Sequence, residues 1–359
     1  MIVSILKESS TEKRVSLLPE QVEVLTEKNI KVLVEHNAGL NAFATDEDYV
    51  QKGAEIVSRE EALLKASLIF SIHPIPSGDI KEGTILAGVF QPLFNAEWVQ
   101  QCQSKSITLF SLDAIPRTTR AQSMDVLSSQ ANIAGYKAVL LAAQLYPRYF
   151  PMFMTAAGSI PPAKMLIIGA GVAGLQAIAT ARRLGAVVEV FDTRPAVKEE
   201  VMSLGGKFVE VDGAADASKA GGYAVEQTEE YKRRQQELIA NSIQKADVVI
   251  TTAQIPGKKA PVLITEDMLD KMRTGSVIID LAAATGGNTA VTKNEETILH
   301  KGVIIVGNSN LASTMPFDAS KLYGKNLLNF LQLVLTPEGE IALNFEDDIV
   351  NATCISKKQ

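Results

Sequence analysis

Three glycines with a characteristic spacing indicate phosphate-binding chemistry. Gly169, Gly171 and Gly174 form a Gly-x-Gly-x-x-Gly run between a short apolar run and a helical pattern. In that setting the first glycine permits a tight turn, the second lets the backbone approach a pyrophosphate, and the third lets the helix lie close to the strand. The helix N-terminus adds oriented N–H groups and about half a positive charge. We therefore predict a dinucleotide-binding turn; the alternative is glycines that serve packing alone.

An acidic residue follows at the distance that such a turn requires. Asp192 lies 18 residues after Gly174, at the end of the next predicted strand. A carboxylate there can accept hydrogen bonds from both hydroxyls of an adenosine ribose, and it repels a 2′-phosphate. These properties favour NAD(H) over NADP(H). Arg194 argues the other way, because a guanidinium at this place suits a 2′-phosphate.

A run of polar residues precedes a long helical pattern. Arg117, Gln122, Asp125 and Ser128 lie just before the helix or within its first turn. One interpretation is helix capping, with Ser123 or Asp125 at the N-cap. The other is a loop that holds a nicotinamide: Gln122 would bond its carboxamide, and Arg117 with Asp125 would fix ribose and ring. None of these side chains is a good general base at pH 7, which suits hydride transfer between two nicotinamides, where catalysis rests on positioning.

The elements that must position these residues alternate between strands and helices. In the first half, strands are predicted at residues 1–6, 31–35, 68–72, 84–89 and 107–111, with helices at 19–28, 46–52 and 59–65. A long helix is predicted at about 125–145 and a loose segment at 155–159. Later strands are predicted at 165–168, 187–191, 247–251, 276–281 and 303–306, with a helix at 172–184. This alternation predicts an α/β fold of two Rossmann-like domains, with parallel sheets and a nucleotide-binding cleft between them.

The domain boundaries follow from length and from the tail. A chain of 359 residues is about twice the usual domain size. An apolar helical pattern at residues 325–334 is expected to pack back on the first domain, which would make that domain discontinuous. We predict one domain from residues 1–128 plus 312–359, and an NAD(H)-binding domain from residues 129–311. The alternative is a tail that simply extends the second domain.

Composition excludes several classes of function. The net charge of −6 argues against nucleic acid as a partner. Two cysteines and three scattered histidines argue against a disulfide framework and against a metal site. No signal peptide or membrane-spanning run is apparent, so we expect a cytoplasmic protein without direct membrane insertion. The acidic run at residues 346–348 is expected at the surface.

Longer stretches resemble one family closely. They are residues 120–136, beginning Arg-Ala-Gln-Ser-Met-Asp, and residues 171–181 and 255–264. The chain resembles the soluble NAD(H)-binding component of proton-translocating NAD(P) transhydrogenases over nearly its whole length. The resemblance implies direct hydride exchange between NAD(H) on this chain and NADP(H) on a partner subunit, coupled to proton passage through a membrane part. It also implies a homodimer, attached peripherally to the inner membrane through membrane-embedded and NADP-binding subunits.

The resemblance also assigns site residues, position by position. Arg117, Gln122, Asp125 and Ser128 fall on the nicotinamide loop; Ala170, Gly171 and Val172 on the phosphate turn; Asp192, Thr193 and Arg194 on the ribose position; Gly222, Tyr223 and Gln235 on a loop that closes over the nucleotide; and Gln254 on the adenosine side. Two departures stand out. Residues 283–285 lack the acidic residue usual in the family, and residues 311–314 differ from its Pro-Ser-Arg-like turn.

Alanine dehydrogenases resemble the same scaffold and provide the main alternative. They carry a lysine and a histidine that activate a keto acid, in strands that here end Ile72-His73-Pro74 and Phe90-Gln91-Pro92, without the lysine. Arg14 remains at the position that holds a substrate carboxylate in those enzymes. A third possibility is a non-catalytic NAD(H)-binding subunit. An amino-acid dehydrogenase predicts turnover of a keto acid by the isolated chain, and the other two predict none.

Overall fold

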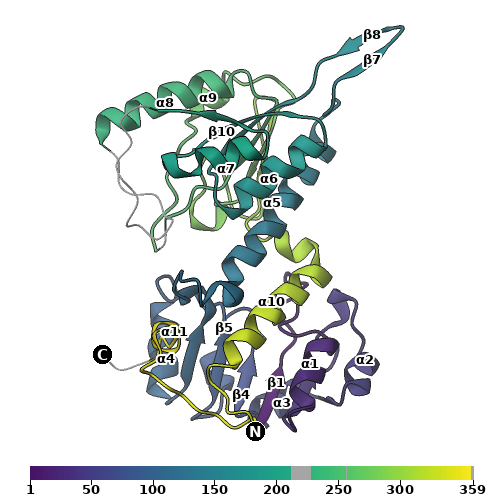
Figure 1. Cartoon of the computed structure of the whole chain (residues 1–359), viewed down its shortest axis with the longest axis vertical. Coiled ribbons are helices and arrows are strands. Elements are labelled where there is room, and N and C mark those ends of the chain that lie inside the picture. Colours follow the sequence, from purple (N-terminus) through teal and green to yellow (C-terminus); the bar gives the residue numbers. More distant parts are fainter. Residues whose placement is uncertain (212–227, 256, 357–359) are drawn as a thin grey trace. The chain divides into compact units, whose positions relative to one another are not determined.

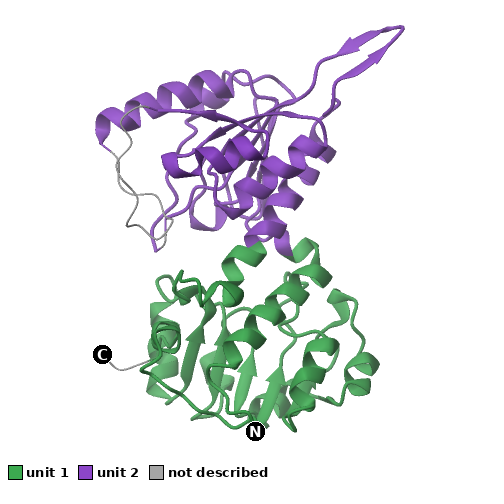
Figure 2. Ribbon diagram, viewed as in Figure 1, with its two compact units in different colours: residues 1–130, 313–359 green, residues 131–312 purple. Residues whose placement is uncertain are grey.

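A computed structural model describes residues 1–211, 228–255 and 257–356 of the chain. It divides into two compact units, Met1–Gln130 with Ser313–Gln359 and Ala131–Ala312 (Figure 2). The chain therefore passes from one unit to the other twice, once within the long helix α5 (Val126–Leu145) and once just before α10 (Pro316–Leu331). None of the helices among the described residues has the length and apolar character needed to span a bilayer.

The first unit is built on a parallel sheet with the strand order β3-β2-β1-β4-β5-β6 (Figure 1). Its strands are β1 Ile2–Ile5, β2 Lys31–Glu35, β3 Glu55–Val57, β4 Leu68–Phe70, β5 Ile85–Gly88 and β6 Thr108–Ser111. The helices between them are α1 Pro19–Thr26, α2 Asp46–Gln51, α3 Arg59–Lys65 and α4 Ala96–Ser104. Side chains alternate along each strand, so Leu68 and Phe70 pack under α1 and α10, whereas Ile69 packs on the face covered by α3 and α4.

The end of the chain completes the first unit. Leu327 and Phe330 of α10 lie in the same apolar cluster as Val3, and the Phe330 ring lies 5.3 Å from that of Phe110. Helix α11 (Asp348–Thr353) adds Ile349 to this cluster. Helix α10 begins at Pro316, nine residues before the predicted start, because a proline suits the first turn of a helix.

The second unit has a sheet with the order β11-β10-β9-β12-β13-β15-β14, in which only β14 runs antiparallel to its neighbour among the described pairings. Its strands are β9 Lys164–Ile168, β10 Val187–Phe191, β11 Lys207–Val209, β12 Val248–Thr251, β13 Val277–Asp280, β14 Glu296–His300 and β15 Val303–Gly307. Helices α6 Val172–Arg183 and α7 Lys198–Ser203 cover one face together with α5, and α8 Glu229–Ile243 and α9 Glu266–Leu269 cover the other. The predicted α/β fold of Rossmann-like units with parallel sheets is confirmed.

A two-stranded hairpin projects from the second unit (Figure 1). Strands β7 (Phe153–Thr155) and β8 (Gly158–Ile160) form it, whereas the sequence predicts a loose segment at residues 155–159. That prediction is wrong, because small residues and short strands without an alternating pattern hide the hairpin. Met152 and Met154, at its base and in its first strand, are 63% and 70% exposed.

Candidate functional site

The phosphate turn joins β9 to α6, and its three glycines meet different constraints. Gly169 has φ +105°, a backbone region that other residues rarely adopt. A Cβ on Gly174 would lie less than 3.0 Å from the carbonyl oxygen of Gly169, so the helix packs against the turn only because that atom is missing. Gly171 has φ −78°, and a Cβ there would meet no atom within 4 Å. The backbone at Gly171 therefore faces open space, as a cradle for a phosphate requires.

The start of α6 carries no side-chain cap. Gly171 occupies the N-cap, and no side chain bonds the first amides of the helix. A helix N-terminus of this kind leaves N–H groups that an anion can satisfy. Val172 and Ala170 flank Gly171, so the residues assigned to the phosphate turn by sequence lie together in the structure. A pyrophosphate fits both the open space and the uncapped helix.

The carboxylate of Asp192 is fully engaged by the chain itself. Its Oδ2 accepts from the backbone N–H of Ala170 at 2.7 Å and from Nη2 of Arg194 at 2.7 Å. Its Oδ1 accepts from the backbone N–H and from Nε of Arg194, at 2.8 and 2.9 Å. The side chain is 6% exposed. Asp192 therefore ties the phosphate turn to the end of β10, and a ribose hydroxyl reaches it only after Arg194 has moved.

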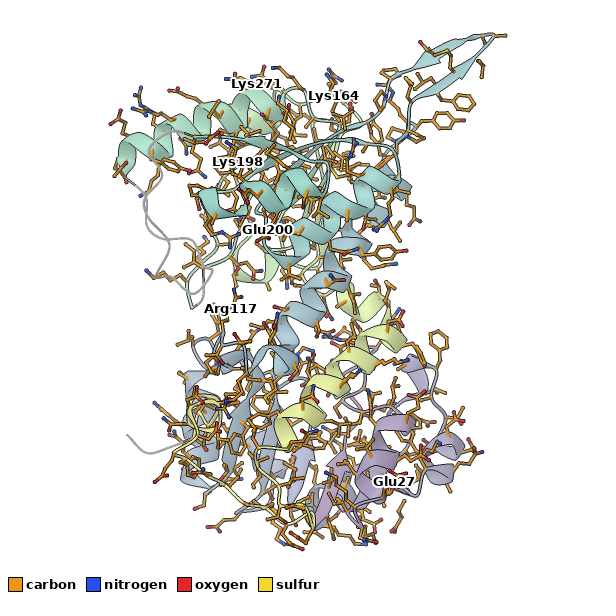
Figure 3. The ribbon with its side chains drawn as sticks, viewed as in Figure 1. Glu27, Arg117, Lys164, Lys198, Glu200 and Lys271 are labelled. Atoms are coloured by element: carbon orange, nitrogen blue, oxygen red, sulfur yellow. The ribbon has the colours of Figure 1, made fainter. Side chains whose placement is uncertain are left out.

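The charge of Arg194 is secured by its neighbours. Hydrogen bonding to Asp192 raises the pKa of its guanidinium, and the negative charge of Glu200 on α7 (Figure 3) acts in the same direction. Thr193, between the two partners, is partly buried. The ribose position predicted from sequence is thus an ion pair in which the counter-ion Arg194 competes with any ligand for the carboxylate.

The third part of this region follows β12, which neighbours β9 in the sheet. Gln254 is exposed and donates from Nε2 to the carbonyl oxygen of Leu281 at 3.2 Å. Because β10 and β12 flank β9, the residues after all three strands meet at one edge of the sheet, where strand order reverses. Ligands of open α/β sheets bind at that switch point. Gln235 is buried on α8, and Gly222 and Tyr223 lie outside the described residues.

Two buried residues near Gln254 escaped the sequence analysis. Asn288 donates from Nδ2 to the carbonyl oxygens of Ala253 and Pro261, both at 2.9 Å, and accepts from the N–H of Ala253. Asp280 accepts from the N–H of Asn288 at 2.7 Å. Together they fix the loops after β12 and β13. The signal available in the sequence was their place in an Asp-Leu-Ala…Gly-Gly-Asn stretch, which carries no recognisable chemistry of its own.

The polar loop of the first unit ends in a helix cap. Asp125 precedes α5, and its Oδ1 accepts from the N–H of Ser128 at 2.9 Å while its Oδ2 accepts from the Ser128 hydroxyl at 2.6 Å. The capping interpretation therefore applies to Asp125 and Ser128. Gln122 begins the short 3-10 helix η4 (Gln122–Met124) and is exposed. Arg117 is exposed on the preceding turn (Figure 3).

A second polar cluster lies after β1 and β4 of the first unit. Glu12 binds Arg14 through both oxygens, at 2.8 and 2.7 Å, and accepts from His73 Nε2 at 2.9 Å. Burial would raise the pKa of Glu12, but these hydrogen bonds hold it well below its usual range. Burial raises the pKa of Glu8 to about 7, although the N–H of Ile72 donates to it. Arg14 is thus already paired with an internal carboxylate, in the two-pronged geometry that a substrate carboxylate would use.

Metal ligands do not gather in this structure. Within the described ranges, no group of three or more His, Cys, Asp or Glu side chains is arranged to hold a metal ion. Both cysteines, Cys102 and Cys354, are free and buried. Burial raises the pKa of the Cys102 thiol to about 11, so its thiolate, the nucleophilic form, is scarce at neutral pH.

Comparison with known proteins agrees with this geometry. The family model for the alanine dehydrogenase/PNT N-terminal domain matches residues 4–134, and that for the C-terminal domain matches residues 138–359. The chain is 46% identical to the first of the separately encoded portions of NAD(P) transhydrogenase subunit alpha in Rhodospirillum rubrum, over 96% of this chain and 93% of that protein. It is 28% identical to the alanine dehydrogenase of Staphylococcus haemolyticus, over 93% and 87% of the two chains. The crystal structure of a transhydrogenase from Sinorhizobium meliloti superposes with a TM-score of 0.89 at 43% identity, over 99% and 98% of the chains.

Proposed function

The chain belongs to the alanine dehydrogenase/PNT family, and from its greater similarity to transhydrogenase alpha subunits we infer that it is the NAD(H)-binding component of a proton-translocating NAD(P) transhydrogenase. In this function, hydride passes directly between NADH held by this chain and NADP⁺ held by a partner subunit, and the exchange is coupled to proton translocation. The alanine dehydrogenase relatives differ in needing an amino acid and a proton-transferring group.

One observation carries this proposal. The polar loop offers hydrogen-bond partners for a nicotinamide, yet its carboxylate is committed, because both oxygens of Asp125 accept from Ser128. A loop of this kind orients a ring without taking up a proton. Hydride exchange between two nicotinamides needs no proton transfer, so orientation and proximity are the contributions required of the protein. Gln122, exposed on η4, would bond the carboxamide, and Arg117 would fix the ribose side.

The second unit would hold the rest of the cofactor. NAD(H) supplies the hydride-carrying nicotinamide when it is bound. The open space at Gly171 and the uncapped α6 suit its pyrophosphate, and Asp192, once released by Arg194, suits the adenosine ribose. Thr193 and Gln254 lie beside these residues, and a loop with Gly222, Tyr223 and Gln235 would close over the nucleotide. NADP(H) would be the co-substrate on the partner.

The proposed assembly is a homodimer bound to membrane-embedded and NADP-binding subunits, on the cytoplasmic side of the inner membrane. The hairpin β7–β8 supports self-association. A lone two-stranded hairpin is marginally stable in water, and this one exposes Phe153, Met154 and the neighbouring Met152. The Tyr149 ring stacks on Phe153 at 5.1 Å and preforms an apolar surface that a second copy of the chain would cover.

The test is a reconstituted transhydrogenation assay. This chain is mixed with an NADP-binding transhydrogenase component, and reduction of an NAD analogue by NADPH is followed. NADH oxidation with pyruvate and ammonium serves as the control reaction. We expect activity only in the mixture, whereas activity in the control reaction alone would identify an amino-acid dehydrogenase. NADH binding with no activity in either assay would identify a non-catalytic subunit.

A pair of neighbouring variants tests the role of the loop. Gln122→Ala removes the proposed carboxamide partner and should lower the exchange rate about 10- to 100-fold. Ser123→Ala changes an equally exposed side chain on the same turn and should leave the rate within about twofold. Equal effects of the two substitutions would contradict the assignment of Gln122.

A further inference from the structure

Two asparagines of α10 hold one carbonyl group of the polar loop. The Nδ2 groups of Asn326 and Asn329 donate to the backbone oxygen of Ser123, at 2.7 and 3.0 Å. Residues three apart on a helix lie on the same face, so both amides reach the same point. Ser123 lies in the middle of η4, directly after Gln122. The backbone that carries Gln122 is therefore bonded to a helix 203 residues further along the chain.

The orientation of Asn326 is determined by this contact. Its Oδ1 is buried and has no hydrogen-bond partner among the described residues. A buried acceptor without a partner is unfavourable, and turning the amide over would only bring that oxygen against the oxygen of Ser123. The side chain thus keeps its donor on the loop at the expense of its own acceptor. This arrangement indicates a contact retained for position rather than for stability.

A second attachment joins the loop to α11. Arg120 donates from Nη1 and Nη2 to the two oxygens of Asp347, at 2.6 and 2.8 Å, and also binds Asp348. Asp347 in turn caps α11 by accepting from the N–H groups of Ile349 and Val350. A two-pronged guanidinium–carboxylate pair fixes geometry as well as charge. The acidic run expected at the surface is therefore the anchor for the start of the polar loop.

Buried side chains alternate with these polar attachments. Ala121 and Met124 are buried in the apolar cluster that contains Phe330 and Ile349, whereas Gln122 between them is exposed. The loop is thus held from α10 and α11 on both sides of the residue that points outward. Free motion of Gln122 is confined to its side chain.

We propose that Asn326, Asn329 and Asp347 are positioning residues that hold the backbone of residues 120–125, so that Gln122 and Asp125 are preset for the nicotinamide. The inference rests on the proposed function for its catalytic consequence. Orientation of reactants is costly to lose, because a displacement of about 1 Å can lower a rate about 100-fold. The C-terminal segment of the chain is by this account part of the hydride-transfer apparatus, although it contributes no side chain to the cofactor.

The experiment replaces amide donors by acceptors of the same shape. Asn329→Asp leaves the donor of Asn326 in place, and the double substitution Asn326→Asp/Asn329→Asp leaves none. Asn95→Asp is the matched control, because Asn95 Nδ2 also donates to a loop carbonyl, that of Phe90, at 2.8 Å in the same unit. Unfolding temperatures are measured for all variants, and assays are run well below them.

The first readout is hydrogen exchange of the full-length protein, which needs no activity. The amides of Met124 and Asp125 donate to the carbonyls of Ala121 and Gln122 and are expected to exchange slowly in the wild type. We expect exchange there to accelerate at least about tenfold in the double variant, less in Asn329→Asp, and not in Asn95→Asp. Unchanged exchange in the double variant would overturn the inference.

The second readout is transhydrogenation with the NADP-binding component. We expect kcat to fall about 10- to 100-fold in the double variant, while KM for NADH changes less than about threefold. A merely structural role would lower the unfolding temperature without this division between kcat and KM. Faster exchange with an unchanged kcat would also overturn the inference. A wild-type chain that is inactive in the mixture would instead refute the proposed function, and hydrogen exchange would still decide whether the asparagines hold the loop.

Discussion

Substitution of two glycines separates nucleotide binding from folding. Gly171→Ala places a methyl group where the structure has open space, on a backbone with φ −78° that alanine adopts freely. The free energy of unfolding should therefore change by less than about 1 kcal/mol. The same methyl would stand between the backbone and the pyrophosphate. Loss of one charge-assisted hydrogen bond is worth about 1.5–3 kcal/mol, so NADH should bind about 10- to 100-fold more weakly.

Gly174→Ala is the opposite case. Its Cβ would lie less than 3.0 Å from the carbonyl oxygen of Gly169, and backbone cannot yield as a flexible side chain does. Forcing an extra methyl into such a contact costs about 1–3 kcal/mol, because helix and strand must separate. Gly174→Ala should therefore lower the free energy of unfolding by that amount, and its binding defect should follow from the displaced helix.

The assays are NADH titration by fluorescence and urea unfolding of both variants beside the wild type. Tight NADH binding by Gly171→Ala, with the fold intact, would refute the placement of the pyrophosphate at this turn. Wild-type stability of Gly174→Ala would refute the argument from close packing. A variant that loses both properties at Gly171 would show that the space there is needed for folding.

Three further outcomes can be measured. The raised pKa of Glu8, about 7 against an ordinary value of 4.5, means that the native state binds the proton more tightly than the unfolded state. Wild-type stability should therefore fall as pH rises from about 4.5 to about 7, and Glu8→Gln should raise the free energy of unfolding by at most about 3 kcal/mol at pH ~8 and not at pH ~4, in urea titrations across that range. Asp192→Asn should weaken NADH binding at least about tenfold and narrow the preference over NADPH, which competitive titration would show; an unchanged preference would contradict the ribose assignment. Replacing Phe153 and Met154 by serine should shift the proposed dimer toward monomer in sedimentation, whereas an unaltered dimer would place the interface elsewhere.

Local chemistry was open to prediction from sequence. The Gly169–Gly174 run is constrained within six residues, because a turn, a phosphate contact and a close helix each dictate a missing side chain. The cap formed by Asp125 on Ser128 spans three residues, so its two members are visible together in the sequence. The parallel sheets follow from the alternation of strands and helices, since parallel neighbours need a crossover between them.

The engagement of charged groups was not open to prediction in the same way. That an acid stands at position 192 is a property of the sequence, but the saturation of both oxygens of Asp192 depends on the rotamer of Arg194 and on the amide of Ala170. The raised pKa of Glu8 likewise depends on burial, which residue type alone does not specify.

The amino-acid sequence by itself determined the fold class, the phosphate turn and the helix cap, because each depends on residues a few positions apart. Only the tertiary structure decided what holds the polar loop. Asn326 and Asn329 reach Ser123, and Asp347 reaches Arg120, across more than 200 residues of chain. An asparagine or an aspartate has no distinguishing pattern at such a distance. Its partner is selected when α10 and α11 pack against the sheet, and that packing is a property of the whole unit.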